Sequence, residues 1–238
     1  MTWLSFAALT CACALGCGPD KPLAPTLQGE RLTRSTALSP SKLNVFSCRS
    51  CHDLSPGDSG ELKMPGAPLA GATLRPSYWG GQELDLLGAI DACRTHFMGA
   101  TEPLDPYSSD AEALYAYLVS LEPGDAREVP FTIVRAIADV PRGDANAGQR
   151  VYDQSCAHCH GAVHSGAGRL NARFPVLPEQ VLAEHAEYTP AQQRLVFVEK
   201  VRHGGFLGYG GDMPPYSLEV LSDVELSDVL EAMAVVGE

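Results

Sequence analysis

Apolar side chains recur along this 238-residue chain with the three- and four-residue spacing of amphipathic helices, whereas convincing two-residue alternation is scarce. Four segments, 82–97, 109–121, 148–156 and 223–233, each gather apolar residues near one face. In the first segment the stripe consists of Leu86, Ile90, Cys93 and Phe97. The pattern predicts a mainly α-helical fold.

Three short motifs predict where helices begin. Residues 109–112 (SDAE), 189–192 (TPAQ) and 222–225 (SDVE) have the spacing of a capping box. In that motif a Ser or Thr side chain accepts from an early helical amide, and a Glu or Gln reaches back to the capping residue. A further short helix is expected over 41–47.

The string Cys-x-x-Cys-His occurs twice, over 48–52 and over 156–160, and the two copies lie 108 residues apart. This is the attachment signature of a c-type haem. Two thiols at this spacing can form thioethers to the vinyl groups of one porphyrin, and the next residue presents its imidazole to the iron. The sequence therefore predicts two covalently bound haem c groups. The attachment residues are Cys48, Cys51, Cys156 and Cys159, and the proximal iron ligands are His52 and His160.

Other uses of paired cysteines fit this pattern less well. A four-cysteine zinc module brings its two pairs within roughly 15–20 residues, far closer than the two motifs here. Neither zinc nor a disulfide requires a histidine directly after both pairs. A thioredoxin-like site would need a βαβ pattern, which the chain lacks.

The repeated motif divides the chain into two haem-binding units, expected over 38–122 and 143–238. Between them, residues 123–142 contain the apolar stretch PFTIVRAIADVP. This composition is too apolar for a free linker, so we expect an extended strap packed along one or both units.

The first 17 residues are uncharged and mostly small or apolar, and the run is too short to span a bilayer. They are typical of a secretory signal peptide. Their end, ALGC, resembles the lipobox of bacterial lipoproteins, which implies a lipid on Cys17. Residues 18–40 are rich in Pro, Thr and Ser, and this composition predicts a flexible tether over residues 18–37. We expect a periplasmic protein, anchored to the membrane only if Cys17 is lipidated.

The chain holds 29 acidic and 17 basic residues, and the formal charge is −12. The excess is shared, with 12 acids and 5 bases over 38–125 and 13 acids and 7 bases over 140–238. This balance argues against nucleic acid as a partner. It favours basic redox proteins as donor and acceptor. Arg75 and Arg169 are candidate partners of haem propionates.

These residues resemble the class I cytochrome c family in a tandem dihaem form. The likeness is closest in the second unit, where GxxxYxxxCxxCHG spans 148–161 and MPPY spans 213–216. It implies two helical domains, each wrapped around one haem. It also implies that Met213 is the distal iron ligand of the second haem, and that Gly148 and Tyr152 cross the last helix.

The first unit lacks a Met-Pro-Pro sequence, so its distal ligand stays open among Met64, Cys93, His96 and Met98. We favour Met98, which follows a predicted helix and precedes Gly99. It lies 46 residues after His52, similar to the 53 residues that separate His160 from Met213. Cys93 lies on an apolar stripe, where a buried thiol ordinarily has only a packing role.

Two functions fit this sequence. Since it has no nucleophile elbow, phosphate loop or paired catalytic carboxylates, we favour a carrier of single electrons in the bacterial envelope over an enzyme. The alternative is a catalytic dihaem cytochrome or enzyme subunit, thiosulfate-oxidising or peroxidase-like. That function needs a non-methionine or open distal site on the first haem, and Cys93 is the residue that favours it.

Overall fold

The computed structural model describes residues 23–121, 129–207 and 211–237. The predicted signal peptide, Cys17 and the first residues of the predicted tether lie outside these ranges. Within them the fold is mainly helical, as predicted, and no strand forms beyond two isolated bridges. No helix of the described residues is long and apolar enough to cross a membrane.

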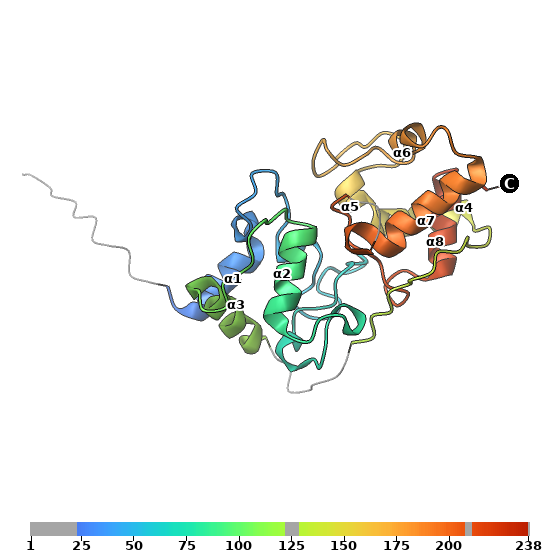
Figure 1. The fold of residues 1–238 in the computed structure, drawn as a ribbon. Helices are drawn as coiled ribbons and strands as arrows, with labels where there is room; N and C mark the ends of the chain where they lie inside the picture. The colour runs from blue at the N-terminus through green and yellow to red at the C-terminus, as the bar shows by residue number, and fades with distance from the viewer. Residues whose placement is uncertain (1–22, 122–128, 208–210, 238) are drawn as a thin grey trace, which may run out of the picture.

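Helices α1 to α3 lie in one unit and α4 to α8 in the other (Figure 1). The α-helices are α1 (Pro25–Arg34), α2 (Leu86–His96), α3 (Ser109–Ser120), α4 (Ala145–Ser155), α5 (Ala157–His160), α6 (Glu179–Glu184), α7 (Pro190–Leu207) and α8 (Asp223–Ala232). The 3₁₀ helices are η1 (Thr36–Leu38), η2 (Cys48–Ser50), η3 (Ala72–Leu74) and η4 (Trp79–Gly81).

Each unit contains a close crossing between its first and its last helix, α1 on α3 and α4 on α8. A glycine lies at each contact. A Cβ atom added to Gly29 would lie 2.0 Å from the carbonyl oxygen of Ala113, and one added to Gly148 would lie 1.9 Å from that of Asp228. The predicted crossing of Gly148 over the last helix is therefore present, and α1 and α3 make a second crossing of the same kind.

The prediction of a flexible tether over 18–37 is wrong for residues 25–37. Helix α1 fills residues 25–34, and η1 follows directly. Pro25 pre-sets the backbone at the first turn, while Gly29 and Thr33 are buried. The helix was missed because its capping residue, Ala24, has no side-chain cap.

The expected helix over 41–47 is also absent. Asn44 organises this segment instead: its amide donates to the carbonyls of Thr36 and Phe46, and its oxygen accepts from the Phe46 amide. An asparagine that satisfies nearby backbone groups competes with helix formation. The segment therefore enters the first motif as turns.

Two of the three predicted capping boxes form. Thr189 and Gln192 cap α7 reciprocally, and Ser222 and Glu225 do the same for α8. At α3 the cap is Ser108, one residue earlier than predicted, and it accepts from the Ala111 amide at 3.2 Å.

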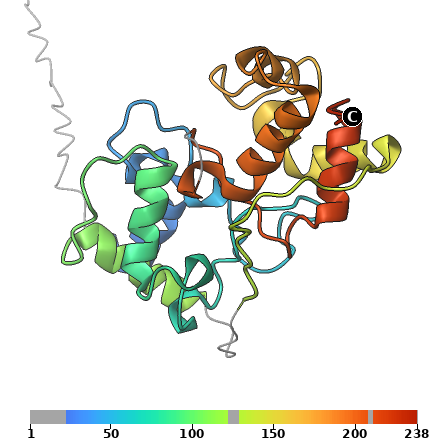
Figure 2. The ribbon, with the colours of Figure 1, turned by 45° about the vertical axis from the view of Figure 1, so that its right-hand side comes forward.

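The described part of the strap, residues 129–142, has no regular secondary structure and runs from the first unit to the second (Figures 1 and 2). Phe131 packs edge-on against Trp79 of the first unit. Val140 is buried in the hydrophobic core of the second. The apolar side chains of this segment therefore pack against both units.

We predict that Gly148→Ala destabilises the protein by about 1–3 kcal/mol, because the new methyl group overpacks the crossing. Alanine alone would stabilise a helix by about 1 kcal/mol relative to glycine, so the sign of the change is informative. Urea unfolding with the matched variant Arg150→Ala, at an exposed position of α4, measures it. A stabilised Gly148→Ala protein would contradict the crossing.

Candidate haem attachment sites

A large apolar cavity opens in the first unit and holds about 1050 Å³ of space, its mouth included. Cys48, Cys51 and His52 lie on its wall, and Leu114 of α3 lies among the apolar residues that line it. Two thiols and an imidazole thus face one apolar space. This donor set fits a covalently attached haem.

One hydrogen bond fixes the ring of His52. Its Nδ1 lies 2.6 Å from the carbonyl oxygen of Ala67, and because a carbonyl only accepts, Nδ1 is the donor. The ring packs so closely on Gly66 that a Cβ there would lie 2.3 Å from Cε1. Burial, the largest influence, lowers the pKa of His52. A neutral ring whose Nε2 is free to bind a metal is what an iron ligand requires.

The second motif repeats this arrangement. Nδ1 of His160 donates to the carbonyl oxygen of Pro175 at 3.0 Å, and burial again lowers the pKa of the ring. In both units the accepting carbonyl follows the histidine by 15 residues. Cys156 is the C-cap of α4, so the helix crossing positions the motif.

Burial disfavours the ionised form of the four motif thiols. Burial raises the pKa of Cys48, Cys156 and Cys159 to about 11 each. The pKa of Cys51 rises to about 12, first through burial and then through the nearby thiols of Cys159 and Cys48. Redox-active Cys-x-x-Cys sites depend on a lowered thiol pKa, so these surroundings disfavour that chemistry.

Among the four candidates for the first distal ligand, Met98 and Cys93 line the cavity with the attachment motif, whereas Met64 and His96 are not part of its wall. Met98 is only 5 % exposed. Burial is the largest influence on Cys93 and raises the pKa of its thiol, with the Cys48 and Cys51 thiols adding to the effect. Of the four candidate ligands, only the two sulfur-containing residues Met98 and Cys93 therefore line the cavity that holds the first motif.

The turn that carries Met98 is held from both sides. Its carbonyl oxygen accepts from the Ser39 hydroxyl at 2.7 Å, and the amide of Ala100 donates to the carbonyl of Arg94 at 2.9 Å. Gly99 between them has a φ of +64°, which glycine adopts without strain. This turn after α2 directs the Met98 side chain into the hydrophobic cluster of the first unit, which Met98 forms with Leu38, Phe46, Phe97 and Leu114.

Met213 is half-buried and packs against the hydrophobic core of the second unit. Its carbonyl oxygen accepts from the Gly205 amide at 2.7 Å. Gly204 breaks the helical path of α7 with a φ of +53°, and a Cβ there would lie 2.3 Å from the Met213 carbonyl oxygen. The end of α7 and the Met-Pro-Pro segment are thus fastened together.

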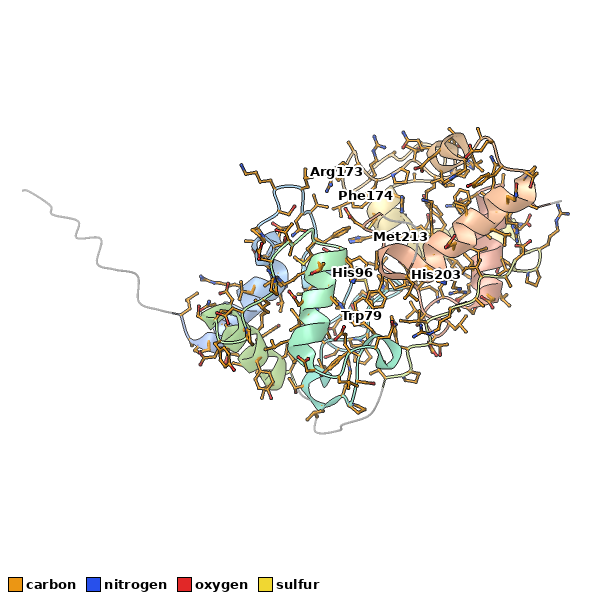
Figure 3. The ribbon with its side chains drawn as sticks, in the orientation of Figure 1. Trp79, His96, Arg173, Phe174, His203 and Met213 are labelled. Carbon is orange, nitrogen blue, oxygen red and sulfur yellow. The ribbon has the colours of Figure 1, made fainter. Side chains whose placement is uncertain are left out.

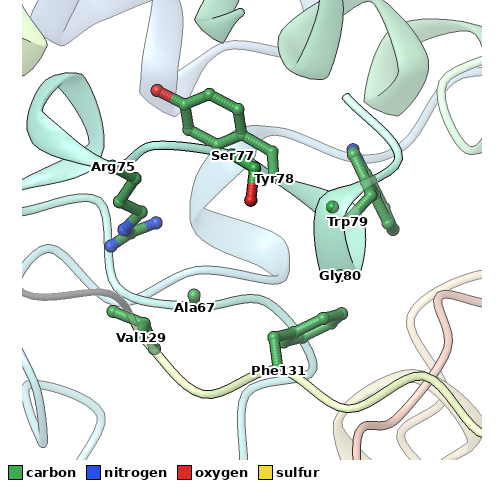
Figure 4. Close-up of a pocket in the computed structure, with 9 residues that line it drawn as sticks. Ala67, Arg75, Ser77, Tyr78, Trp79, Gly80, Val129 and Phe131 are labelled. Atoms are coloured by element: carbon green, nitrogen blue, oxygen red, sulfur yellow. The ribbon is translucent and has the colours of Figure 1, made fainter. Parts of the chain in front are cut away.

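A second cavity, of about 570 Å³ with its mouth included, adjoins the first one. Arg75, Tyr78, Trp79 and Phe131 line both, and the guanidinium and the Ser77 hydroxyl face the smaller space (Figure 4). The Nη2 of Arg75 donates to the carbonyl oxygens of Pro68 and Ala70, whereas its buried Nε has no hydrogen-bond partner among the described residues. An unpaired donor at the edge of the large cavity fits a haem propionate. The other candidate, Arg169, donates to the Phe174 carbonyl at 3.2 Å.

Lys63 joins the two units, and no sequence signal marked it. Its amide donates to the carbonyl of Gln154 at 2.8 Å. Its ammonium group lies 2.7 Å from Glu225 and donates to the carbonyl of Val220. Burial alone would raise the pKa of Glu225, but the hydrogen bonds from Lys63 and Ser222 outweigh it and lower the pKa.

We predict that Met98→Ala removes one of two His/Met signatures in near-infrared magnetic circular dichroism, because the variant loses a thioether ligand. The matched variant Cys93→Ala should leave spectrum and potential nearly unchanged and cost about 1 kcal/mol of packing stability. If Cys93→Ala instead abolishes a low-spin thiolate signal, Cys93 is the ligand and the prediction is wrong.

Residues 143–231 match the protein family described as cytochrome C oxidase, cbb3-type, subunit III. No curated protein matches the chain. The family match covers the second motif and Met213 and begins where the second unit was expected to begin. It supports a c-type cytochrome domain in this part of the chain, and with it covalently bound haem c and a role in electron transfer.

Proposed function

We propose that the chain is a tandem dihaem c-type cytochrome that carries single electrons between protein partners in the bacterial cell envelope. The observation that carries the proposal is the repeated site geometry. Each Cys-x-x-Cys-His motif ends in a histidine whose Nδ1 donates to a carbonyl 15 residues later. The family match reaches only the second motif, so this repetition is the support for a haem in the first.

The chemistry comes from the haem, which when bound supplies a one-electron iron couple. The protein's own residues attach, orient and shield it. Four thiols would form the attachment points, His52 and His160 would offer Nε2, and the thioethers of Met98 and Met213 would complete the ligand sets. Soft thioether ligands and apolar walls both favour the ferrous state and raise the potential.

The leader-like residues 1–17 support an envelope location, and a lipid on Cys17 would anchor the protein to the membrane. Covalent haem attachment outside the cytoplasmic membrane fits this location. The charge of −12 supports donor and acceptor proteins that present basic surfaces, because opposite fields steer association. Nucleic acid is not a proposed partner.

A catalytic role remains the second candidate, and one observation favours it. Cys93 lines the first cavity together with Cys48, Cys51 and His52. A thiolate there would lower the potential of the first site and suit a thiosulfate-oxidising or peroxidase-like dihaem protein. The identity of the first distal ligand separates the two functions.

We predict that the matured protein carries two haems per chain, because both attachment motifs are intact. Intact-mass measurement after acid-acetone extraction should show two haem additions. Zinc in place of haem, or a single addition, would contradict the proposal.

We predict that Met213→Ala lowers the potential of the second haem and allows cyanide or carbon monoxide to bind, because the iron loses a soft ligand. Redox titration and ligand-binding spectra measure both effects. The control is Met64→Ala, since Met64 lies outside the wall of the first cavity. If the Met213 variant keeps two sulfur-to-iron charge-transfer bands, the ligand is another residue.

A further inference from the structure

We propose that the stacked rings of Trp79 and Phe206 position the two haem sites against one shared wall. The inference rests on the proposed function, since it requires a haem at each motif.

The attachment residues themselves meet at the boundary. Cys159, which belongs to the second motif, packs against the hydrophobic cluster of the first unit. The same cluster contains the buried Met98 and is packed by Cys48 and Cys93. Thus the cysteine edge of the second site lies against the core that encloses the first.

The Met-Pro-Pro segment faces both sites. Met213 packs against the second core, whereas the next two residues, Pro214 and Pro215, line the first cavity together with Cys51 and His52. One short segment therefore carries the distal ligand proposed for one site and closes the pocket of the other.

Pairs of aromatic rings pack across the boundary between the two units. Trp79 of the first unit and Phe206 at the end of α7 stack with centroids 4.4 Å apart and planes 15° from parallel. Phe46 and Phe174 meet at 5.6 Å. His96 adds an edge contact with Phe206 at 4.8 Å. Figure 3 shows Trp79, His96, Phe174 and Met213 gathered where the units meet.

The backbone of Trp79 adopts a strained conformation. Its φ of +53° is rare for a residue with a side chain and costs on the order of 1–3 kcal/mol. Such a conformation persists where surrounding contacts over-determine it. Here the ring lines both cavities and stacks across the boundary, so the strained backbone serves the contact between the sites.

An electron exchange between the two sites would balance within the molecule. If a haem is bound at each motif and the chain holds one electron, the iron that loses this electron would be oxidised and the iron that gains it would be reduced. No proton or further reactant is needed. The outer partners supply and remove the electron, and a chain built in this way can receive it at one unit and deliver it at the other.

The test is electron paramagnetic resonance of the haem-loaded protein, with the haem count measured on the same sample. In the fully oxidised protein the two ferric centres should relax each other. When redox poising makes one site ferrous and diamagnetic, the relaxation of the other should slow. If the relaxation of each ferric site is independent of the redox state of the other, the shared wall is overturned. A count of one haem would overturn the proposed function instead.

Variants test the positioning role. Phe206→Leu removes the stack on Trp79 and should weaken the coupling, whereas Phe206→Tyr keeps a ring and should restore it. The matched control is Tyr107→Leu, an aromatic residue that is 94 % exposed, which should match the parent protein. If Phe206→Leu couples as strongly as Tyr107→Leu, the ring pair does not position the sites.

Discussion

The position of each proposed haem site depends on one constraint, the close backbone contact between the first and last helices of its unit. Gly29 and Gly148 allow contacts that any side chain would prevent. In the second unit the crossing helix α4 ends at Ser155, and its C-cap residue, Cys156, is the first residue of the motif. In the first unit, Thr33 of α1 and Leu114 of α3 line the cavity beside that crossing. The helix contact thus positions the attachment motif of the second unit and part of the cavity wall of the first.

Backbone carbonyls fix the imidazole rings of His52 and His160. An acceptor at Nδ1 fixes ring orientation and tautomer and leaves Nε2 for the iron. The acceptors, Ala67 and Pro175, come from loops rather than helices. Burial lowers the pKa of both rings, which keeps them neutral and able to bind a metal. The glycine-rich loops after each motif are therefore part of the site.

Sequence reasoning identified the features with a short-range chemical signature. The two motifs, the starts of α7 and α8 and the stripe of α2 could be read from spacing alone. Helix α1 could not, because it lacks a side-chain cap and its stability comes from packing on α3. The contacts of Lys63 and Phe206 across the boundary were equally hidden, since residues far apart in sequence leave no local pattern. The carbonyl 15 residues after each histidine could have been found by aligning the two motifs.

The central claim is that both motifs hold haem in one continuous structure. The most direct measurement is proteolysis of the matured protein, followed by isolation and sequencing of the peptides that absorb as haem. Two peptides are expected in equal amounts, one containing residues 48–52 and one containing residues 156–160. Haem on the second peptide alone, with free thiols at Cys48 and Cys51, would contradict the account.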